Sequence, residues 1–168
     1  EIGVRLVGSE MCIRDRVMNS NLFYSERTQD KRYDEWIKDH PQHIAWGACN
    51  IDPRAVKRLN RITDATKAKI VVSSTWRSDS NLQEVFTLVG IKEPIYDVTP
   101  YMRSRHRGSE IQEWLDKQTE PYRYVILDDD SDMLDCQLPY FIQTDWLKWG
   151  LSDEDVEQAI HILNDTAA

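Results

Sequence analysis

Four carboxylates stand within five positions of the chain: Asp128, Asp129, Asp130 and Asp132. They directly follow the run Tyr-Arg-Tyr-Val-Ile-Leu at 122–127, which has the character of a buried strand. Carboxylates this close repel one another unless a cation neutralises them. Oxygen ligands of this kind suit Mg²⁺, which binds through one or two carboxylates, water and substrate phosphate. The cluster therefore predicts a magnesium site, and the alternative is a solvated acidic turn.

A second group of polar side chains follows the apolar run 69–72. Ser73, Ser74 and Thr75 offer hydroxyl and backbone N–H donors that can hold a phosphate oxygen. Arg77 follows two residues later, and its planar donor fork suits a phosphate oxyanion. Turn chemistry is the alternative, because Ser and Thr are common in turns.

The chain also has a basic loop and two tryptophans that bear on substrate binding. Arg103, Arg105 and Arg107 stand close together in an acidic protein, and they indicate phosphate-charge stabilisation or guidance of an anionic substrate; a solvated loop is the alternative. Trp146 and Trp149 follow a predicted strand and can stack on a base, although core or rim packing is the simpler interpretation.

Strand and helix patterns alternate along the chain. An N-cap at Asp52 with Pro53 predicts a helix to about 68, and Ser109 with Gln112 reads as a capping box that opens a helix over 110–117. Residues 20–50 read as a loop-rich insertion with one short helix near 33–38. The remaining expected elements are strands at 69–75, 95–98, 122–127 and 140–144 and helices at 81–89 and 153–163. This alternation predicts an α/β fold whose ligands bind beyond the carboxyl ends of parallel strands.

Composition limits the class of protein. The 168 residues carry 21 Lys and Arg against 29 Asp and Glu, a net charge of −8, which argues against bulk duplex binding. The length suits one domain. Three cysteines without a CxxC motif exclude a disulfide framework and a zinc ribbon. The cysteines are therefore expected to be free thiols in a reducing cytoplasm. No apolar run is long enough for a membrane helix, so we expect no membrane partner, and nothing in the sequence implies an obligate protein partner.

Four motifs together resemble the haloacid dehalogenase (HAD) superfamily. They are Ser-Ser-Thr-Trp-Arg at 73–77, Arg-Gly-Ser-Glu-Ile at 107–111, Val-Ile-Leu-Asp-Asp-Asp-Ser-Asp at 125–132 and Gln-Thr-Asp…Gly-Leu at 143–151. More narrowly, they are similar to the HAD domains of Swiss-army-knife RNA repair proteins and their stand-alone, often phage-borne relatives. The resemblance implies a Rossmann-like three-layer sandwich with a mostly parallel five-stranded sheet, of order 5-4-1-2-3, and a small cap or none.

The resemblance also implies a mechanism and its residues. The family hydrolyses phosphomonoesters with Mg²⁺ through an aspartyl-phosphate formed on a first-motif Asp, and a second Asp acts as general acid and base. Matching positions assign catalytic roles to Ser73, Arg107 and Asp128. Phosphate binding falls to Ser73 or Ser74, Arg77 and Arg107, with Arg105 as the substitute for Arg107. The metal ligands expected from the motif are Asp128, Asp129 and Asp132.

The N-terminus departs from this pattern. Residues 6–15 read as one frame of a translated sequencing-library adapter, so we expect residues 1–16 to be non-native and 17–168 to form the domain; a natural amphipathic N-terminus is the alternative. Counted back from Val17, the motif glycine falls on Arg16, the general acid on Asp15 and the nucleophile on Ile13. The chain is therefore predicted to lack its nucleophile, and Gly3–Val7 is predicted to fill the central strand position.

We expect a phosphatase domain that acts on nucleotides or polynucleotide ends, because an insertion of this size leaves the site open to large substrates. Two alternatives stay open. One is a non-catalytic metal- or nucleic-acid-binding module on the same scaffold, and the other is a small-metabolite phosphatase.

Overall fold

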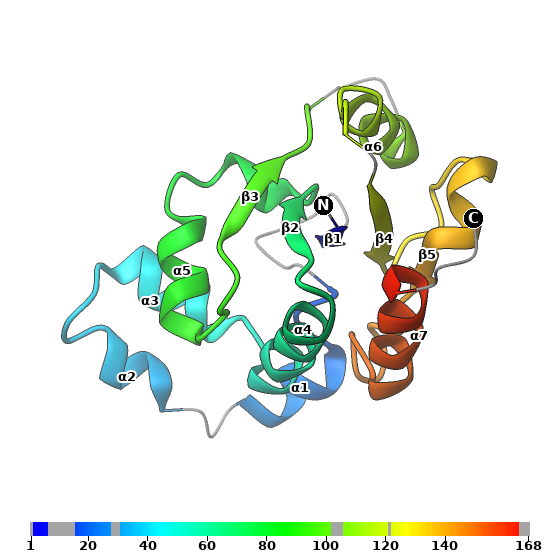
Figure 1. Cartoon of the computed structure of the whole chain (residues 1–168). Coiled ribbons are helices and arrows are strands. Elements are labelled where there is room, and N and C mark those ends of the chain that lie inside the picture. Colours follow the sequence, from blue (N-terminus) through cyan, green and yellow to red (C-terminus); the bar gives the residue numbers. More distant parts are fainter. Residues whose placement is uncertain (1, 7–15, 28–30, 102–105, 121, 165–168) are drawn as a thin grey trace.

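The computed structural model describes residues 2–6, 16–27, 31–101, 106–120 and 122–164, with side chains from residue 16 onward. Helices and strands alternate along most of the chain (Figure 1). The elements in chain order are β1 (Ile2–Leu6), α1 (Asn21–Glu26), α2 (Arg32–Trp36), α3 (Gln42–Cys49), α4 (Pro53–Thr66), β2 (Lys69–Val72), η2 (Thr75–Ser78), α5 (Leu82–Val89), β3 (Ile95–Val98), α6 (Arg107–Leu115), β4 (Arg123–Asp128), η3 (Asp135–Tyr140), β5 (Phe141–Gln143) and α7 (Asp153–Asn164).

The strands pair in parallel in the order β3-β2-β1-β4-β5. Two pairs, β2 with β3 and β4 with β5, are joined through β1. Gly3–Leu6 pairs with Lys69–Val72 on one side, and Ile2–Leu6 pairs with Arg123–Leu127 on the other. The segment predicted for the central position thus lies there over Gly3–Leu6, while Val7 falls outside the described residues. The α/β fold class is confirmed.

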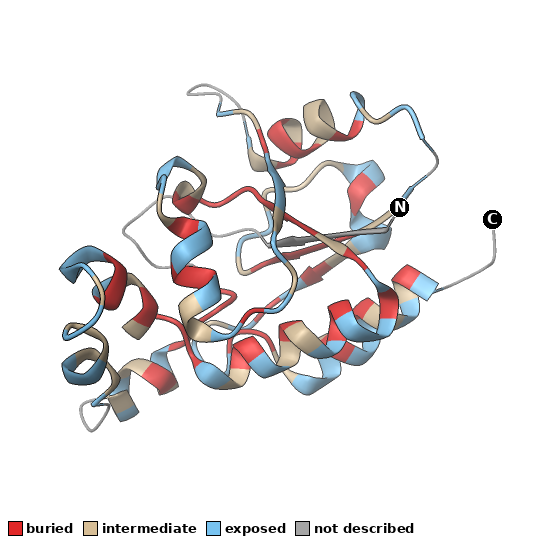
Figure 2. Cartoon of the chain, turned by 60° about the vertical axis from the view of Figure 1, so that its left-hand side comes forward, coloured by how far each residue is buried: buried red, intermediate tan, exposed pale blue. Residues whose placement is uncertain are grey.

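Two hydrophobic cores lie on opposite faces of β4, because successive side chains of a strand point to opposite faces. Val125 and Leu127 belong to the larger core, which also takes buried residues of α3, α4, α5 and α7. Ile126 packs with Ile111 and Leu115 of α6 in a smaller core. The buried stretches of β2 and β4 run through the interior, and the helices turn their exposed faces outward (Figure 2).

Three helices follow the predicted pattern closely. Asp52 caps α4 by accepting a hydrogen bond from the Arg54 amide at 2.8 Å, and the helix ends at Lys67 with φ 58°. α5 ends at Gly90 with φ 88°, the left-handed conformation that favours glycine. α7 begins with a reciprocal capping box between Ser152 and Asp155.

Two expectations about helices are wrong. Residues 20–50 form three short helices rather than a loop-rich insertion with one helix, and α1 begins where the Ser20 hydroxyl accepts from the Phe23 amide at 3.2 Å. α6 begins at Arg107 rather than Glu110, with His106 at the N-cap instead of Ser109. The cause is a tertiary contact: the Asp132 carboxylate accepts from the Arg107 amide at 3.1 Å and so supplies an acceptor for the first turn.

No helix in the described part of the chain is long and apolar enough to cross a membrane.

Candidate active site

Ser73 and Ser74 follow the carboxyl end of β2, and both are buried. The Ser74 hydroxyl accepts from the Trp76 amide at 3.3 Å and so caps the short helix η2. The backbone turns sharply here, because η2 starts within three residues of the strand. The expected turn chemistry is therefore present at Ser74, and the turn holds Ser73 at the end of the sheet.

Asp128 is the last residue of β4 and has no exposed surface. Its Oδ1 accepts a hydrogen bond from the Asp130 amide at 3.0 Å, and its carbonyl oxygen accepts from the Thr144 amide at 2.7 Å. The strand ending and these two contacts fix the carboxylate at the carboxyl edge of the sheet. β1 ends between β2 and β4 at this edge, so Ser73 and Asp128 flank the end of the central strand.

Arg107 connects these two positions. It is the first residue of α6, its Nη1 donates to the carbonyl oxygen of Ser73, and its Nε lies 4.0 Å from Oδ2 of Asp128. Its side chain is 11% exposed. The structure thus brings together Ser73, Arg107 and Asp128, the three residues predicted to be catalytic, from three elements that are distant in sequence.

Arg77 lies deeper, and its Nη1 is held by the protein. It donates to the Ser73 carbonyl at 2.9 Å, to the Thr99 hydroxyl at 2.7 Å and to the Glu110 carboxylate at 2.9 Å. The Arg77 and Glu110 side chains are only 5% and 6% exposed. Arg77 therefore ties the end of β2 to the end of β3 and to α6. Its contact with phosphate stays a prediction.

Asp129 forms the second carboxylate at the end of β4. Its side chain is 5% exposed, and its Oδ2 accepts from Nη1 of Arg16 at 3.0 Å. Its Oδ1 is buried and has no hydrogen-bond partner among the residues that the structure describes. The Arg16 guanidinium also lies over the Trp146 ring, 5.0 Å from its centroid. Arg16 thus places a cation beside a predicted metal ligand.

Asp132 contacts the start of α6 through both its carboxylate and its backbone. Oδ2 accepts from the Arg107 amide, Oδ1 lies 3.0 Å from Nδ1 of His106, and its carbonyl accepts from the Gly108 amide at 2.9 Å. Asp132 therefore caps the N-terminus of α6. Within the described residues, no group of three or more His, Cys, Asp or Glu side chains is placed to hold a metal ion. The three-carboxylate ligand set stays a prediction, and Asp132 is its weakest member.

Four of the predicted positions lie outside the described residues. They are Arg103 and Arg105 of the basic loop and the two first-motif positions, Ile13 and Asp15.

Two residues of this edge, Glu110 and Thr144, lie within the quoted motifs, but the sequence analysis gave them no role. Glu110 holds Arg77 from α6, yet a glutamate in the first turn of a helix gives no sequence signal of burial. Thr144 follows β5 and is buried, with its hydroxyl unpartnered in the described part of the chain. The rule that ligands bind beyond strand ends would have found Thr144, because it follows a strand just as Ser73 and Asp128 do.

The arrangement offers anion-binding donors beside a buried carboxylate. A guanidinium and hydroxyl groups can hold phosphate oxygens, and the carboxylates at the end of β4 can hold a hard cation. A search of curated proteins and a search of solved structures each find no match to the chain. The model of one family, the HAD domain in Swiss Army Knife RNA repair proteins, matches residues 15–156. Because this match spans most of the chain and includes every strand-end motif described above, the chain belongs to that family of HAD domains.

Proposed function

We propose that this domain is a Mg²⁺-dependent phosphomonoester hydrolase that acts on nucleotide or polynucleotide ends. The observation that carries the proposal is the Arg107 guanidinium, which lies between the Ser73 backbone and the Asp128 carboxylate. A fixed cation beside a buried carboxylate at the strand ends is the arrangement that phosphoryl transfer needs, because its catalysis is mainly positioning and charge stabilisation.

The residues present fit a magnesium ion. Asp128 and Asp129 are adjacent carboxylates at the end of β4, and the buried Oδ1 of Asp129 has no partner among the described residues. One or two carboxylates are what Mg²⁺ requires from a protein. We therefore assign Asp128 and Asp129 as the ligands, with Asp132 as a more remote candidate. A bound ion would neutralise charge on the substrate phosphate.

The protein's own groups would bind and orient the phosphate. Ser73 or Ser74 and Arg107 would donate hydrogen bonds to its non-reacting oxygens, and Arg107 would balance the charge that these oxygens carry in the transition state. Arg77 would act mainly through the protein, by fixing the Ser73 carbonyl that Arg107 also contacts. The family resemblance places the nucleophile and the general acid at positions 13 and 15.

The natural gene product would then follow a two-step reaction. The Asp carboxylate at position 13 would attack phosphorus, and the bond from phosphorus to the ester oxygen would break as the second Asp protonates that oxygen. Water would then cleave the acyl phosphate and restore the carboxylate. In this chain Ile occupies position 13, so we propose that it does not hydrolyse phosphomonoesters.

We further propose that residues 1–16 are adapter-derived and that the native part of this chain, residues 17–168, lacks its own first strand. Two observations support this. The adapter reading covers residues 6–15, and the family match begins only at residue 15. The native domain would have its own central strand in the position of β1, which completes a five-stranded HAD-type sheet with only the small helices α1–α3 as a cap.

Replacing residues 1–16 tests the proposal. A chain whose first residues form an apolar strand that ends Asp-x-Asp-Gly should release phosphate from phosphorylated oligonucleotides with Mg²⁺. The same chain with Asp128→Asn should lose this activity. The chain as given should be inactive, and activity in it would contradict the assignment of position 13.

The substrate panel separates the alternatives. Oligonucleotides with a 3′- or a 5′-phosphate, free nucleotides and sugar phosphates are compared at equal concentration. A preference for sugar phosphates would indicate a small-metabolite phosphatase. Oligonucleotide binding without hydrolysis in the restored chain would indicate a binding module. The RNA-repair family name favours the nucleic-acid end.

A further inference from the structure

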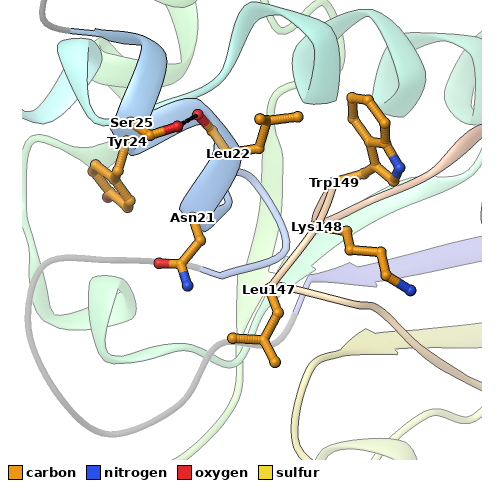
Figure 3. A pocket seen from close by; sticks show the side chains of 7 residues that line it. All are labelled: Asn21, Leu22, Tyr24, Ser25, Leu147, Lys148 and Trp149. Carbon is orange, nitrogen blue, oxygen red and sulfur yellow. Dashed lines mark hydrogen bonds between the residues drawn. The ribbon is translucent and has the colours of Figure 1, made fainter.

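A hollow with a volume of about 740 Å³ lies between α1 and the loop that follows β5. Its size falls within the range of small-ligand sites. Its walls include Leu22 and Tyr24 of α1 and Leu147, Lys148 and Trp149 of the loop (Figure 3). Figure 3 shows Leu22 directed from α1 toward the loop that carries Trp149.

The hollow borders the catalytic edge of the sheet. The loop over 144–150 leaves the carboxyl end of β5, which runs parallel to β4, so it starts at the edge where Asp128 and Asp129 lie. Trp146 of this loop is contacted by Arg16, which also pairs with Asp129. The Asn21 amide at the start of α1 donates to the Trp146 carbonyl at 2.9 Å. The loop wall is thus linked to Asp129 through Arg16, and the α1 wall is joined to the loop at the Trp146 carbonyl.

The loop presents its aromatic side chain rigidly. The Asp145 carbonyl accepts hydrogen bonds from the amides of Lys148, Trp149 and Gly150 at 3.0–3.1 Å. Gly150 has φ 62°, and a Cβ there would lie 2.5 Å from the Asn19 carbonyl oxygen, so the backbone packs closely on the segment before α1. Trp149 is nevertheless 46% exposed and Leu147 is 66% exposed. Two large apolar side chains held open to solvent beside a hollow are typical of a binding surface.

Two cations lie beside the hollow, and each is paired with carboxylates of the protein. Lys148 lines the hollow and pairs with Asp145 at 3.2 Å, and the Arg54 guanidinium lies 5.9 Å from the centroid of the Trp149 ring. Hydrogen bonding to Asp52 raises the pKa of Arg54, and Glu26 also pairs with it at 3.0 Å. Arg54 is thereby held in place beside the indole. Aromatic faces with neighbouring cations are how proteins bind unpaired bases and their phosphates.

We propose that this hollow binds the unpaired nucleobase next to the terminal phosphate of a single-stranded RNA or DNA end, with that base stacked on Trp149. The proposal rests on the proposed function, because it assumes that the phosphate occupies the site at Ser73, Arg107 and Asp128. It assigns Trp149 as a specificity-determining residue that distinguishes a nucleic-acid end from a sugar phosphate.

Oligonucleotide binding to Trp149→Ala tests this assignment. Fluorescence anisotropy is measured with labelled pentanucleotides that carry a 5′- or a 3′-phosphate. Trp149→Ala should weaken binding about fivefold or more, as expected for loss of one base-stacking contact, and Trp149→Phe should retain most of the affinity. The matched control is Trp46→Ala, because Trp46 is similarly exposed at 43% but lies on α3 away from the hollow. It should leave the affinity within about twofold.

A second ligand makes the test specific for the base. This ligand is a pentanucleotide whose phosphorylated terminal residue is abasic. The parent chain should bind it about as weakly as Trp149→Ala binds the intact oligonucleotide. Its affinities for the parent chain and for Trp149→Ala should be equal. Equal affinities of the parent chain and Trp149→Ala for the intact oligonucleotide would overturn the proposal. A second result would also overturn it. If Trp149→Ala weakens binding only because it converts a dimer to a monomer in sedimentation, the hollow would be a contact between copies of the chain.

The two proposals can fail separately. The chain with a restored first motif could bind the oligonucleotide in a base-dependent way and yet release no phosphate. This result would contradict the proposed function and support the nucleobase site. The restored chain could instead release phosphate while its affinity for the oligonucleotide depends neither on Trp149 nor on the terminal base. This result would support the proposed function and contradict the nucleobase site.

Discussion

Two arginines converge on one backbone oxygen at the proposed phosphate site. Arg77 and Arg107 both donate to the Ser73 carbonyl, but they differ in their remaining contacts. Arg77 is paired with Glu110 in the interior, whereas Arg107 lies at the start of α6 beside Asp128. The sequence could suggest both as phosphate ligands because both are basic residues near strand ends. It could not separate them, because the partner Glu110 comes from a distant helix.

We predict that Arg77→Met lowers the free energy of unfolding by about 3 kcal/mol. The substitution removes a buried ion pair and two further hydrogen bonds, and losing one partner of a buried pair is costly because the other charge stays inside. Urea unfolding followed by circular dichroism measures the change. The matched control is Arg61→Met, whose side chain is 48% exposed and whose partners Asp153 and Glu157 are also exposed, and it should cost less than about 1 kcal/mol. Equal losses would contradict the role of Arg77.

Arg16 provides a second prediction at a single residue. Its guanidinium pairs with Oδ2 of Asp129, so it should compete with Mg²⁺ for that oxygen. Arg16→Gly should tighten Mg²⁺ binding about fivefold or more, since removing a charged hydrogen bond of about 1 kcal/mol or more corresponds to that factor. The midpoint of Mg²⁺-dependent thermal stabilisation measures it. Arg61→Ala removes the same charge at the distant α4–α7 pairing and serves as the control. The same midpoint in both variants would exclude competition by Arg16.

At the scale of elements, the sequence predicted those helices whose start and end signals are local. α4 has Asp52 and Pro53 at its start, and α7 has the Ser152–Asp155 capping box. α1 was missed although Ser20 is an ordinary N-cap, because six residues are too few for hydrophobic periodicity to show. α6 was placed too late, because its first turn is satisfied by Asp132 from another segment. The same contact removes Asp132 from the immediate surroundings of Asp129, which the motif spacing could not reveal.

The junction between the loop before α7 and the segment before α1 depends on Gly150. A Cβ at this position would lie 2.5 Å from the Asn19 carbonyl oxygen and 2.9 Å from the Val17 carbonyl oxygen. We predict that Gly150→Ala destabilises the protein by about 2 kcal/mol more than Gly90→Ala does. Both glycines have a positive φ, so the conformational cost of about 1 kcal/mol is shared. A Cβ at Gly90 would have no atom within 4 Å, so Gly90→Ala measures the conformational cost alone. Urea unfolding compares the variants, and equal losses would mean that the junction relaxes freely.

The pairing of α4 with α7 predicts a pH dependence. The hydrogen bond from Arg58, with further attraction from Arg61, lowers the pKa of Asp153 from its ordinary value of 3.8. A carboxyl whose folded-state pKa is lowered stabilises the protein above its unfolded pKa, and this contribution is lost as the pH falls through the lower, folded value. Because the side chain is largely exposed, Asp153→Asn should cost less than about 1 kcal/mol at pH 7.

This cost of Asp153→Asn should disappear as the pH falls below about 4, and it should shrink in 0.5 M salt. Thermal unfolding of the two proteins across pH measures it. Asp39→Asn is the control, because Asp39 is exposed and makes no ion pair within the described part of the chain. A cost that does not change with pH would show that Asp153 acts through packing rather than charge.

At the scale of the whole molecule, the central strand of the sheet is the segment that we propose to be adapter-derived. β1 pairs with β2 on one side and β4 on the other, and through it the pairs β2–β3 and β4–β5 form one sheet. Only backbone pairing is required for this, so a segment such as Ile-Gly-Val-Arg-Leu can occupy the position whatever its origin. The proposed chemistry is different, because it would require particular side chains at positions 13 and 15. Under this proposal, a segment of another origin would replace the strand without replacing the nucleophile.

A proline scan of the sheet tests this dependence. Val4 is paired with Ile70 and with Val125, so Val4→Pro removes a backbone donor in the middle of the central strand. An acceptor left without its partner inside a sheet costs about 1–3 kcal/mol, to which the steric effect of the ring is added. We therefore expect a loss of about 2 kcal/mol or more in urea unfolding, together with exposure of apolar surface that binds a hydrophobic dye.

Tyr96→Pro is the matched control for Val4→Pro. Tyr96 lies on the edge strand β3, at the irregularity where the pairing skips from Ile95 to Asp97, and proline is tolerated at edges and bulges. If Val4→Pro is no more damaging than Tyr96→Pro, residues 2–6 do not hold the two strand pairs together. If it is more damaging, and a native-type strand that ends Asp-x-Asp-Gly then raises both stability and phosphatase activity, one segment provides the centre of the sheet and the reacting carboxylate. That outcome would support the proposal that this chain keeps the fold and lacks the nucleophile.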